Sequence, residues 1–347
     1  MDLYFLDDNF SIIDGPIDTF TSIVWCERYF EIGTFTLHFP REVLNRVMNA
    51  TYVSTSPAEG EIKCGRIDYI IADDDVDCEM GGRLLESLLS DRVIRGKGVF
   101  TGDVASITEF VVTDNLRDCG ITMGTSDSVS GYASLAYEYN CISDWLYSVL
   151  KPFGASFSVK LDPESREPVF RVINGKNRTV DGPREEGIQP AIFSSSFGNI
   201  SSIRLESDSS RMKNYIFVEG KDGTVVTVDK SDGGHIREMY YHAGDIAAGS
   251  FATAELYKEA LVCRGESVLR NFNAGLSLSA ECDGDALPRY GVDYFLGDIC
   301  DVADEALGMS FDMRLTGVDT VCENGVKTVF PLFGEEIRYI DRLKSQL

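Results

Sequence analysis

Two adjacent strand-like segments near the amino terminus constrain the fold most, because one of them is apolar on both faces. Residues 34–40 alternate between apolar and polar side chains, which is the period-two pattern of a half-buried strand. Residues 22–30 carry large apolar groups on both faces, mixed with charges. The apolar residues are Phe35, Leu37 and Phe39 in the second segment, and Ile23, Val24, Trp25, Cys26, Tyr29 and Phe30 in the first. The first strand therefore needs two surfaces to pack against, its own core and something else.

The charges of this strand need partners too, because an unpaired buried charge is costly. The second surface belongs either to another module of the chain or to another subunit. Trp25 also fits the strand's own core, and each arginine also fits an ion pair within one subunit or a solvated position. The candidate contacts between subunits or modules are Trp25, Glu27, Arg28, Tyr29, Arg83 and Arg92.

The order of the segments predicts an α+β, β-rich chain with two or three domains over its 347 residues. Residues 1–78 and 191–347 read as β modules, barrels or small sandwiches, around a mixed α/β region at residues 79–190. A long helix at about 252–272 belongs to the third part. Residues 174–190 are rich in Gly, Pro and charge, and are predicted to be a linker or exposed loop.

Apolar spacing predicts three shorter helices. They cover residues 42–49, 81–94 and 143–150. Residues 106–120 fit either a helix or a strand, since their β-branched residues conflict with their apolar spacing. Lys221-Asp222-Gly223 and Asn324-Gly325 each predict the turn of a β-hairpin.

Composition narrows the compartment and the partners. The nine cysteines are scattered and never form Cys-x-x-Cys, which favours reduced core residues in a reducing cytoplasm. No apolar run is long enough for a membrane span, and the amino terminus has no basic region typical of a signal peptide. The net charge of −24 argues against a protein that grips nucleic acid.

A passage lined with carboxylates, in contrast, would repel phosphates and let DNA slide past. Residues 276–310 contain eight acidic side chains and one basic one, within a segment of strands. High solubility is the simpler explanation of this charge. The candidate acids facing such a lumen are Asp283, Asp285, Asp298 and Asp301.

Motifs of catalysis and metal binding are missing from the sequence. The three histidines lack the spacing of a zinc site, and the acidic run at residues 73–77 lacks the Gly and Glu positions of a calcium loop. We find neither a Gly-x-Ser-x-Gly nor a phosphate-binding Gly-Lys-Ser motif. We therefore expect a protein that is not an enzyme and that uses no cofactor or metal.

Five motifs in order resemble the Gp37-like tail proteins of long-tailed bacteriophages and prophages, within the wider tail-hub class. The region from about 96 to 195 carries little of this resemblance. The motif residues are Trp25, Glu27, Arg28, Tyr29, Gly33 and Phe35; Gly82, Arg83, Leu84, Leu85, Leu88, Leu89 and Arg92; Phe197, Gly198, Asn199, Lys213 and Asn214; Tyr290, Asp293, Leu296, Gly297 and Asp298; Val318, Val321, Glu323, Gly325, Pro331, Phe333 and Gly334.

The resemblance implies a structural virion protein at the phage tail tip, assembled in the bacterial host cytoplasm. Proteins of this class typically form trimers, in which each subunit supplies two tube-like β-barrel modules to a pseudo-sixfold ring. The implied partners are further copies of the chain, a tail tube or distal tail protein, the tape-measure protein and tail fibre or spike proteins. DNA would pass through the lumen without specific binding.

Two alternatives remain at this point. One is a tail-associated cell-wall hydrolase or peptidase, and the other is a receptor-binding or carbohydrate-binding tail module. Hydrolysis of purified host wall would favour the first, and binding of the isolated chain to host cells would favour the second.

Overall fold

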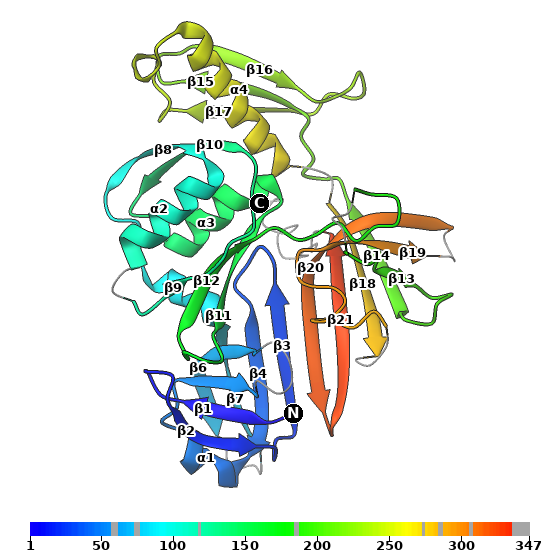
Figure 1. Cartoon of the computed structure of the whole chain (residues 1–347). Helices are drawn as coiled ribbons and strands as arrows, with labels where there is room; N and C mark the ends of the chain where they lie inside the picture. Colours follow the sequence, from blue (N-terminus) through cyan, green and yellow to red (C-terminus); the bar gives the residue numbers. More distant parts are fainter. Residues whose placement is uncertain are drawn as a thin grey trace.

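Four packed parts make up the chain in the computed structural model (Figure 1). The structure describes residues 1–56, 62–72, 77–116, 119–183, 187–272, 275–283, 287–304 and 308–334. Four clusters of buried apolar side chains correspond to these parts, and the cluster of residues 85–172 also includes Leu6, Phe10 and Tyr52 from the N-terminal part of the chain. The chain is mostly β, and its sheets carry few helices, as the segment pattern predicted.

The N-terminal β module comes first and is drawn in blue in Figure 1. It contains β1 (Leu3–Leu6), β2 (Ile12–Ile17), β3 (Ser22–Arg28), β4 (Thr34–Pro40), α1 (Arg41–Val47), β5 (Tyr52–Thr55), β6 (Cys64–Ala72) and β7 (Asp77–Leu84). Phe35, Leu37 and Phe39 are at most 2% exposed, which confirms the alternation predicted for this strand. The expected boundary at residue 78 falls within β7, which lies between β4 and β6 in the sheet.

The α/β region follows in cyan and green. Its elements are a 3₁₀ helix (Leu85–Asp91), β8 (Lys97–Asp103), α2 (Val104–Leu116), β9 (Thr122–Met123), β10 (Tyr132–Glu138), α3 (Ile142–Leu150), a second 3₁₀ helix (Lys151–Phe153), β11 (Ser156–Leu161) and β12 (Pro168–Ile173). The ambiguous segment is a helix, because Ile107, Val111 and Val112 bury one helical face in the core. The helix predicted at residues 81–94 is instead the end of β7 followed by 3₁₀ structure.

The C-terminal β module is built from two stretches of the chain. It comprises β13 (Ile192–Ser194), β14 (Ser201–Asp208), β18 (Gly275–Asp283), β19 (Ile299–Asp304), β20 (Met309–Glu323) and β21 (Val326–Gly334). The hairpin predicted at Asn324-Gly325 joins β20 to β21. The first half of β20 pairs with β19 and its second half with β21.

A helix-and-sheet module, defined as residues 213–272, lies between these two stretches. It contains β15 (Tyr215–Gly220), β16 (Val225–Asp229), β17 (Glu238–Ala243), a short 3₁₀ turn (Ala248–Ser250) and α4 (Ala254–Arg270). In α4 we recognise the long helix predicted at about 252–272, with the Thr253 side chain accepting from Leu256 N at 3.2 Å as its cap. We expected this helix to form part of the C-terminal β module. It packs instead on β15 and β16, in a module with its own core.

One sheet joins the two β modules. Its strand order is β14-β18-β21-β20-β3-β4-β7-β6-β5-β1-β2, with β19 and β13 attached to β20. The free edge of β3 pairs with β20 of the same chain, from Ser22 opposite Glu323 to Arg28 opposite Gly317. Because this edge is used by β20, neither β module closes on itself within the described residues. Two closed barrels were expected, and the described chain has one shared open sheet.

Candidate assembly site at the junction of the modules

Strand β3 lies where three of the four parts meet (Figure 1). Ile23, Trp25, Glu27 and Tyr29 lie on one face of this strand, and each is at most 2% exposed. The other face, with Val24, Cys26 and Arg28, is only half-buried, so the second packing surface predicted for it is not found among the described residues. The further neighbour of this strand is β20 of its own chain, which pairs with its edge. Trp25 packs in the N-terminal core, with its ring 5.4 Å from that of Phe35.

Glu27 connects charges from separate parts. Its carboxylate accepts from Lys63 Nζ at 2.5 Å and from Lys160 Nζ of β11 at 3.2 Å. Lys63 also donates to Thr320 Oγ1 of β20 at 3.1 Å. Burial acts to raise the pKa of Glu27, but the two ammonium groups outweigh it and hold the pKa at about 2. The carboxylate thus stays ionised at the centre of the junction.

Tyr29 reaches from the end of β3 into the next two parts. Its hydroxyl lies 3.1 Å from Gly154 O and 3.0 Å from Ile173 O, the two carbonyls to which it can donate, and it accepts from Gly175 N at 3.3 Å. The Arg314 guanidinium lies 5.5 Å from the centre of its ring. One side chain therefore contacts the α/β region and the C-terminal β module together.

The approach of Gly297 to this ring requires a glycine. Gly297 has a φ of +95°, and a Cβ atom there would lie 2.3 Å from a ring carbon of Tyr29. Its carbonyl accepts from Arg314 Nη1 at 2.5 Å. The glycine and the tyrosine are both in the motifs described above, and the structure explains their pairing by contact.

Arg28, on the other face of β3, pairs within the chain. Its guanidinium donates to Asp319 Oδ1 of β20 at 2.5 Å and to the Glu27 carbonyl at 2.9 Å. The Asp319 side chain is 37% exposed, so this ion pair contributes little to stability by itself.

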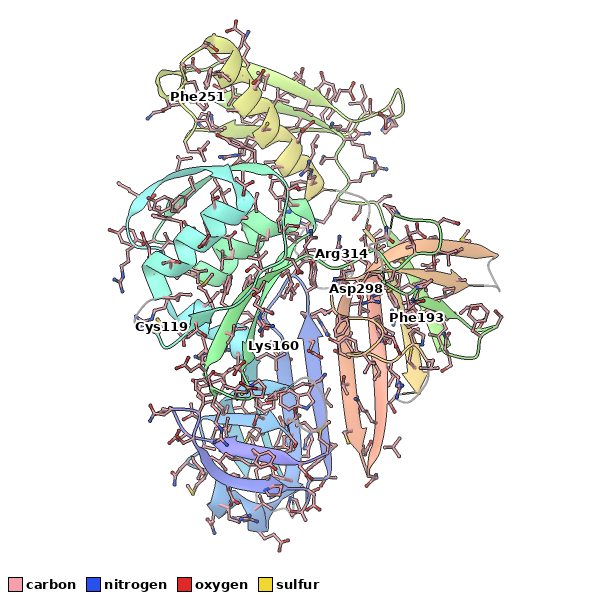
Figure 2. The ribbon with its side chains drawn as sticks, viewed as in Figure 1. Cys119, Lys160, Phe193, Phe251, Asp298 and Arg314 are labelled. Carbon is pink, nitrogen blue, oxygen red and sulfur yellow. The ribbon has the colours of Figure 1, made fainter. Side chains whose placement is uncertain are left out.

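A buried pair of Arg178 and Asp298 was missed in the sequence. The Arg178 guanidinium donates to Asp298, whose carboxylate also accepts from Lys176 N at 2.7 Å and Phe295 N at 3.0 Å. Figure 2 shows Asp298 and Arg314 near the same central point. Arg178 is 6% exposed, although it belongs to the segment predicted to be a linker or exposed loop. The Gly-rich, charged composition of residues 174–190 did not indicate that Arg178 would be buried against Asp298.

Between these groups lies a cavity of about 270 Å³. It is lined by both acids and bases, together with apolar side chains from three parts of the chain. Glu86 is one of the lining residues, and its Oε2 has no hydrogen-bond partner within the described part of the chain. Burial raises the pKa of Glu86, and Lys160 opposes this shift. The lining residues include Glu27, Glu86, Lys160, Arg178, Tyr290 and Asp298.

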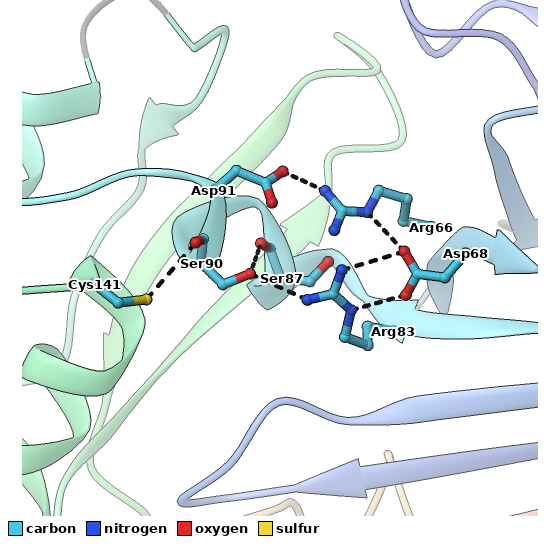
Figure 3. Close-up of polar contacts among 7 residues, drawn as sticks. All are labelled: Arg66, Asp68, Arg83, Ser87, Ser90, Asp91 and Cys141. Carbon is cyan, nitrogen blue, oxygen red and sulfur yellow. Dashed lines mark hydrogen bonds and ion pairs between the residues drawn. The ribbon is translucent and has the colours of Figure 1, made fainter.

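The other two predicted contact residues lie away from this junction. Arg83 Nε donates to Asp68 at 2.8 Å in a chain of ion pairs that continues through Arg66 to Asp91 (Figure 3). Arg92 follows the first 3₁₀ helix, and its carbonyl accepts from Ile142 N at 3.0 Å. Arg83 is therefore paired within the chain, which was the alternative left open for it.

Of the four acids predicted to face a lumen, only two have described side chains. Asp298 is 2% exposed, so it is not a surface group of this chain. Its ion pair with Arg178 compensates for the burial of the carboxylate. Asp301 is half-buried and accepts from Val180 N at 2.8 Å. Burial raises the pKa of Asp301, and Asp312, directly opposite on β20, adds to the rise. Asp285 lies outside the described residues, and of Asp283 only the backbone is described.

The described residues contain no cluster of three or more His, Cys, Asp or Glu side chains arranged to hold a metal ion. Residues 73–76, most of the acidic run considered for calcium, lie outside the described part of the chain. None of the helices described is both long enough and apolar enough to span a membrane. The junction contains ion pairs and hydrogen bonds that join parts of the chain.

The fold is similar to those of solved tail proteins, two of which come from prophages. The 43 kDa tail protein of prophage MuSo2 from Shewanella oneidensis superimposes with a TM-score of 0.59 at 14% identity, over 96% of this chain and 97% of that chain. The tail protein from Neisseria meningitidis MC58 gives 0.61 at 11% identity, over 96% of each chain. Prophage tail protein gp18 from Listeria monocytogenes EGD-e gives 0.55 at 13% identity, over 100% and 98%. At sequence identities this low, the similarity shows a shared fold and nothing further.

Comparison with curated proteins found no match. A family model, described as Siphovirus ReqiPepy6 Gp37-like protein, matches residues 2–335. This match covers nearly the whole chain and confirms the resemblance that the sequence motifs indicated. The chain belongs to the Siphovirus ReqiPepy6 Gp37-like family of phage tail proteins.

Proposed function

We propose that this phage tail protein is a structural subunit of the tail-tip hub, a ring that closes or adapts the end of the tail tube. Its work is assembly and conduction: it holds neighbouring tail proteins in place and lets the tape-measure protein and DNA pass. The proposal places it in the virion, after assembly in the host cytoplasm.

The pairing of β3 with β20 supports this role most directly. It fixes two β modules side by side in one sheet, with β2 at one end and β14 at the other. Three such subunits supply six β modules, which is the number needed to match a hexameric tube to a threefold tip. Glu27 and Tyr29 link the N-terminal β module to the α/β region, and Lys63, the partner of Glu27, donates to Thr320 of the C-terminal β module. These contacts would keep the two modules at a fixed angle.

In this ring, each module would complete its tube-like wall with strands or surfaces from the neighbouring subunit. The partners are two further copies, a tail tube or distal tail protein, the tape-measure protein, and tail fibre or spike proteins. The net charge of −24 supports a lumen that repels DNA phosphates. Among the described residues, Asp301 and Asp312 are the candidates for that surface. Asp298 is no longer a candidate because it is buried.

The role we propose is not catalytic. Of the acids that line the junction cavity, Glu27 is paired with Lys63 and Lys160 and Asp298 with Arg178, and no histidine is among the described lining residues. Release of soluble fragments from purified host cell wall, abolished by substituting one acid pair, would contradict this part of the proposal.

The ring itself is tested by mass and by imaging. We expect mass photometry and sedimentation of the purified chain to show a species of three times 38.4 kDa at high concentration. We also expect electron microscopy of tail particles to place three copies around the lumen at the tip, with carboxylates on the lumen wall. A chain that stays monomeric and is absent from tail particles would overturn the hub; a neutral or basic lumen would overturn the charge proposal alone.

A further inference from the structure

The sheet of the helix-and-sheet module has one face covered and the other open (Figure 1). Ile216 and Val218 of β15 and Val228 of β16 are buried under α4. The opposite face consists of the alternate residues of each strand. On it, Val225 is 52% exposed and Tyr240 is 57% exposed. Apolar and aromatic groups thus face outward on a sheet whose core is already complete.

The strand registers bring three aromatic rings together on this open face. Phe217 of β15 lies directly opposite Tyr240 of β17, and Tyr215 precedes Phe217 on the same face. The rings of Tyr215 and Phe217 are 5.2 Å apart. The Tyr240 hydroxyl donates to the Glu219 carboxylate, which fixes the position of the most exposed ring. Since the three side chains stand on one face of one sheet, the rings form a platform and do not surround a ligand.

Carboxylates border this aromatic platform on three sides. Asp229 and Glu238 flank Tyr215 on the neighbouring strands, and Glu219 follows Phe217. The positions on this face, which are alternate residues of 215–219, 225–229 and 238–242, include neither Lys nor Arg. An ionised carboxylate is an acceptor, so this border suits a ligand that donates several hydrogen bonds.

This combination excludes some ligands and fits one class well. Nucleic acid also stacks on sheet aromatics, but it needs a basic groove for its phosphates. An anionic lipid surface is disfavoured for the same electrostatic reason. A neutral sugar chain has flat C–H faces that pack on aromatic rings and hydroxyl groups that donate to carboxylates.

We infer that the open face of β15, β16 and β17 binds a neutral oligosaccharide, with sugar rings stacked on Phe217 and Tyr240 and hydroxyl groups donated to Glu219, Asp229 and Glu238. This inference goes beyond the hub role and does not depend on it, because the platform lies within one subunit. A ring-forming subunit without sugar binding would contradict the inference alone.

The test titrates the full-length protein with neutral oligomers of N-acetylglucosamine and of glucose, using calorimetry and saturation-transfer NMR. We expect at least one of them to bind with a dissociation constant of about 1 mM or tighter. The substitution Tyr240→Ala should weaken that binding about tenfold, as removal of an aromatic anchor does. Tyr240→Phe keeps the ring and should stay within about threefold of the natural protein.

Tyr132→Ala is the matched control, because Tyr132 is also a strand tyrosine, is 62% exposed and lies on β10, outside the platform. It should leave sugar binding unchanged. Should Tyr240→Ala disturb folding, Thr227→Lys provides a second test, because Thr227 is exposed beside Phe217 and a long side chain there would cover the ring.

Three results would overturn the inference. One is the absence of binding of both oligomers at about 10-fold above that concentration. Another is sugar binding that neither Tyr240→Ala nor Thr227→Lys weakens. The third is oligolysine binding that Tyr240→Ala removes while neither sugar binds, which would show that the face recognises a basic protein segment.

Discussion

Glu27 shows how one residue can hold parts of the chain together. It lies on β3, but the charges that stabilise its carboxylate come from Lys63 and from Lys160 of the α/β region. Replacing a whole buried ion cluster by apolar groups is often neutral, whereas removing one partner leaves the other charges unpaired and is costly. The cost of a substitution here therefore reports on the joint between the parts.

At the residue scale, we predict that Glu27→Gln lowers the free energy of unfolding by about 3 kcal/mol at neutral pH. The pKa of Glu27 is lowered from 4.5 to about 2, so its contribution is fully present above pH 4.5 and is lost as the pH falls through 2. The difference in the free energy of unfolding between the natural protein and Glu27→Gln should therefore decrease as the pH falls from 4.5 to about 2. Thermal unfolding at a series of pH values measures it.

The matched control is Glu109→Gln, since Glu109 is an exposed residue of α2. Its free energy of unfolding should equal that of the natural protein at every pH. A Glu27→Gln protein that unfolds like the natural one at neutral pH would show that the cluster does not stabilise the joint.

Among the elements, β20 has the widest set of partners. Its first half pairs with β19, and its second half lies between β21 and β3. Its 15 residues let it serve both sets of neighbours. The two β modules depend on this one strand for their backbone pairing.

At the element scale, we predict that Val321→Pro destabilises the protein by about 3 kcal/mol or more, because Pro removes a ladder N–H in a central strand. Val321 lies opposite Val24 on one side and Thr328 on the other. Limited proteolysis should cut near the joint sooner, and the thermal midpoint should fall.

Ile12→Pro serves as the control. Ile12 is the first residue of β2, an end strand of the sheet, where proline is better tolerated. Equal losses for the two substitutions would show that the joint has no special role in stability.

At the scale of the whole molecule, the helix-and-sheet module is an insertion in the C-terminal β module, between β14 and β18. Lys213 N donates to Phe272 O at 2.8 Å, so the chain leaves and returns at one point. The module has its own core of eight buried residues, including Ile216, Tyr257 and Leu261. Contacts with the α/β region, such as Arg270 Nη1 donating to Pro152 O at 3.0 Å, are peripheral to that core.

At this scale, we predict that replacing residues 214–271 by two glycines leaves the other three parts folded. Circular dichroism should still show cooperative unfolding, with a thermal midpoint within about 5 °C of the full chain. The same deletion should abolish the sugar binding inferred above. Loss of cooperative unfolding would show that the module is required for the fold of the rest.

Features of the fold that depend on neighbouring residues were predictable from the sequence, and those that depend on distant contacts were not. Phe35, Leu37 and Phe39 were placed correctly because a strand's alternation is local, and Asn324-Gly325 because a tight turn is set by its own backbone. The segment at 106–120 was ambiguous until packing selected a helix. Arg178 was not recognised as buried, because its partner Asp298 is 120 residues away.

The sequence by itself determined that β3 has one face in a core, since Ile23 and Trp25 recur with the period of two that a half-buried strand requires. It also determined the family, through motifs whose residues the structure brings into contact, such as Tyr29 and Gly297. Only the tertiary structure decided that the other face of β3 stays half-buried and that its edge pairs with β20 of the same chain. Pairing of strands so far apart in the chain depends on the competition among all edges and cores, which no local pattern contains.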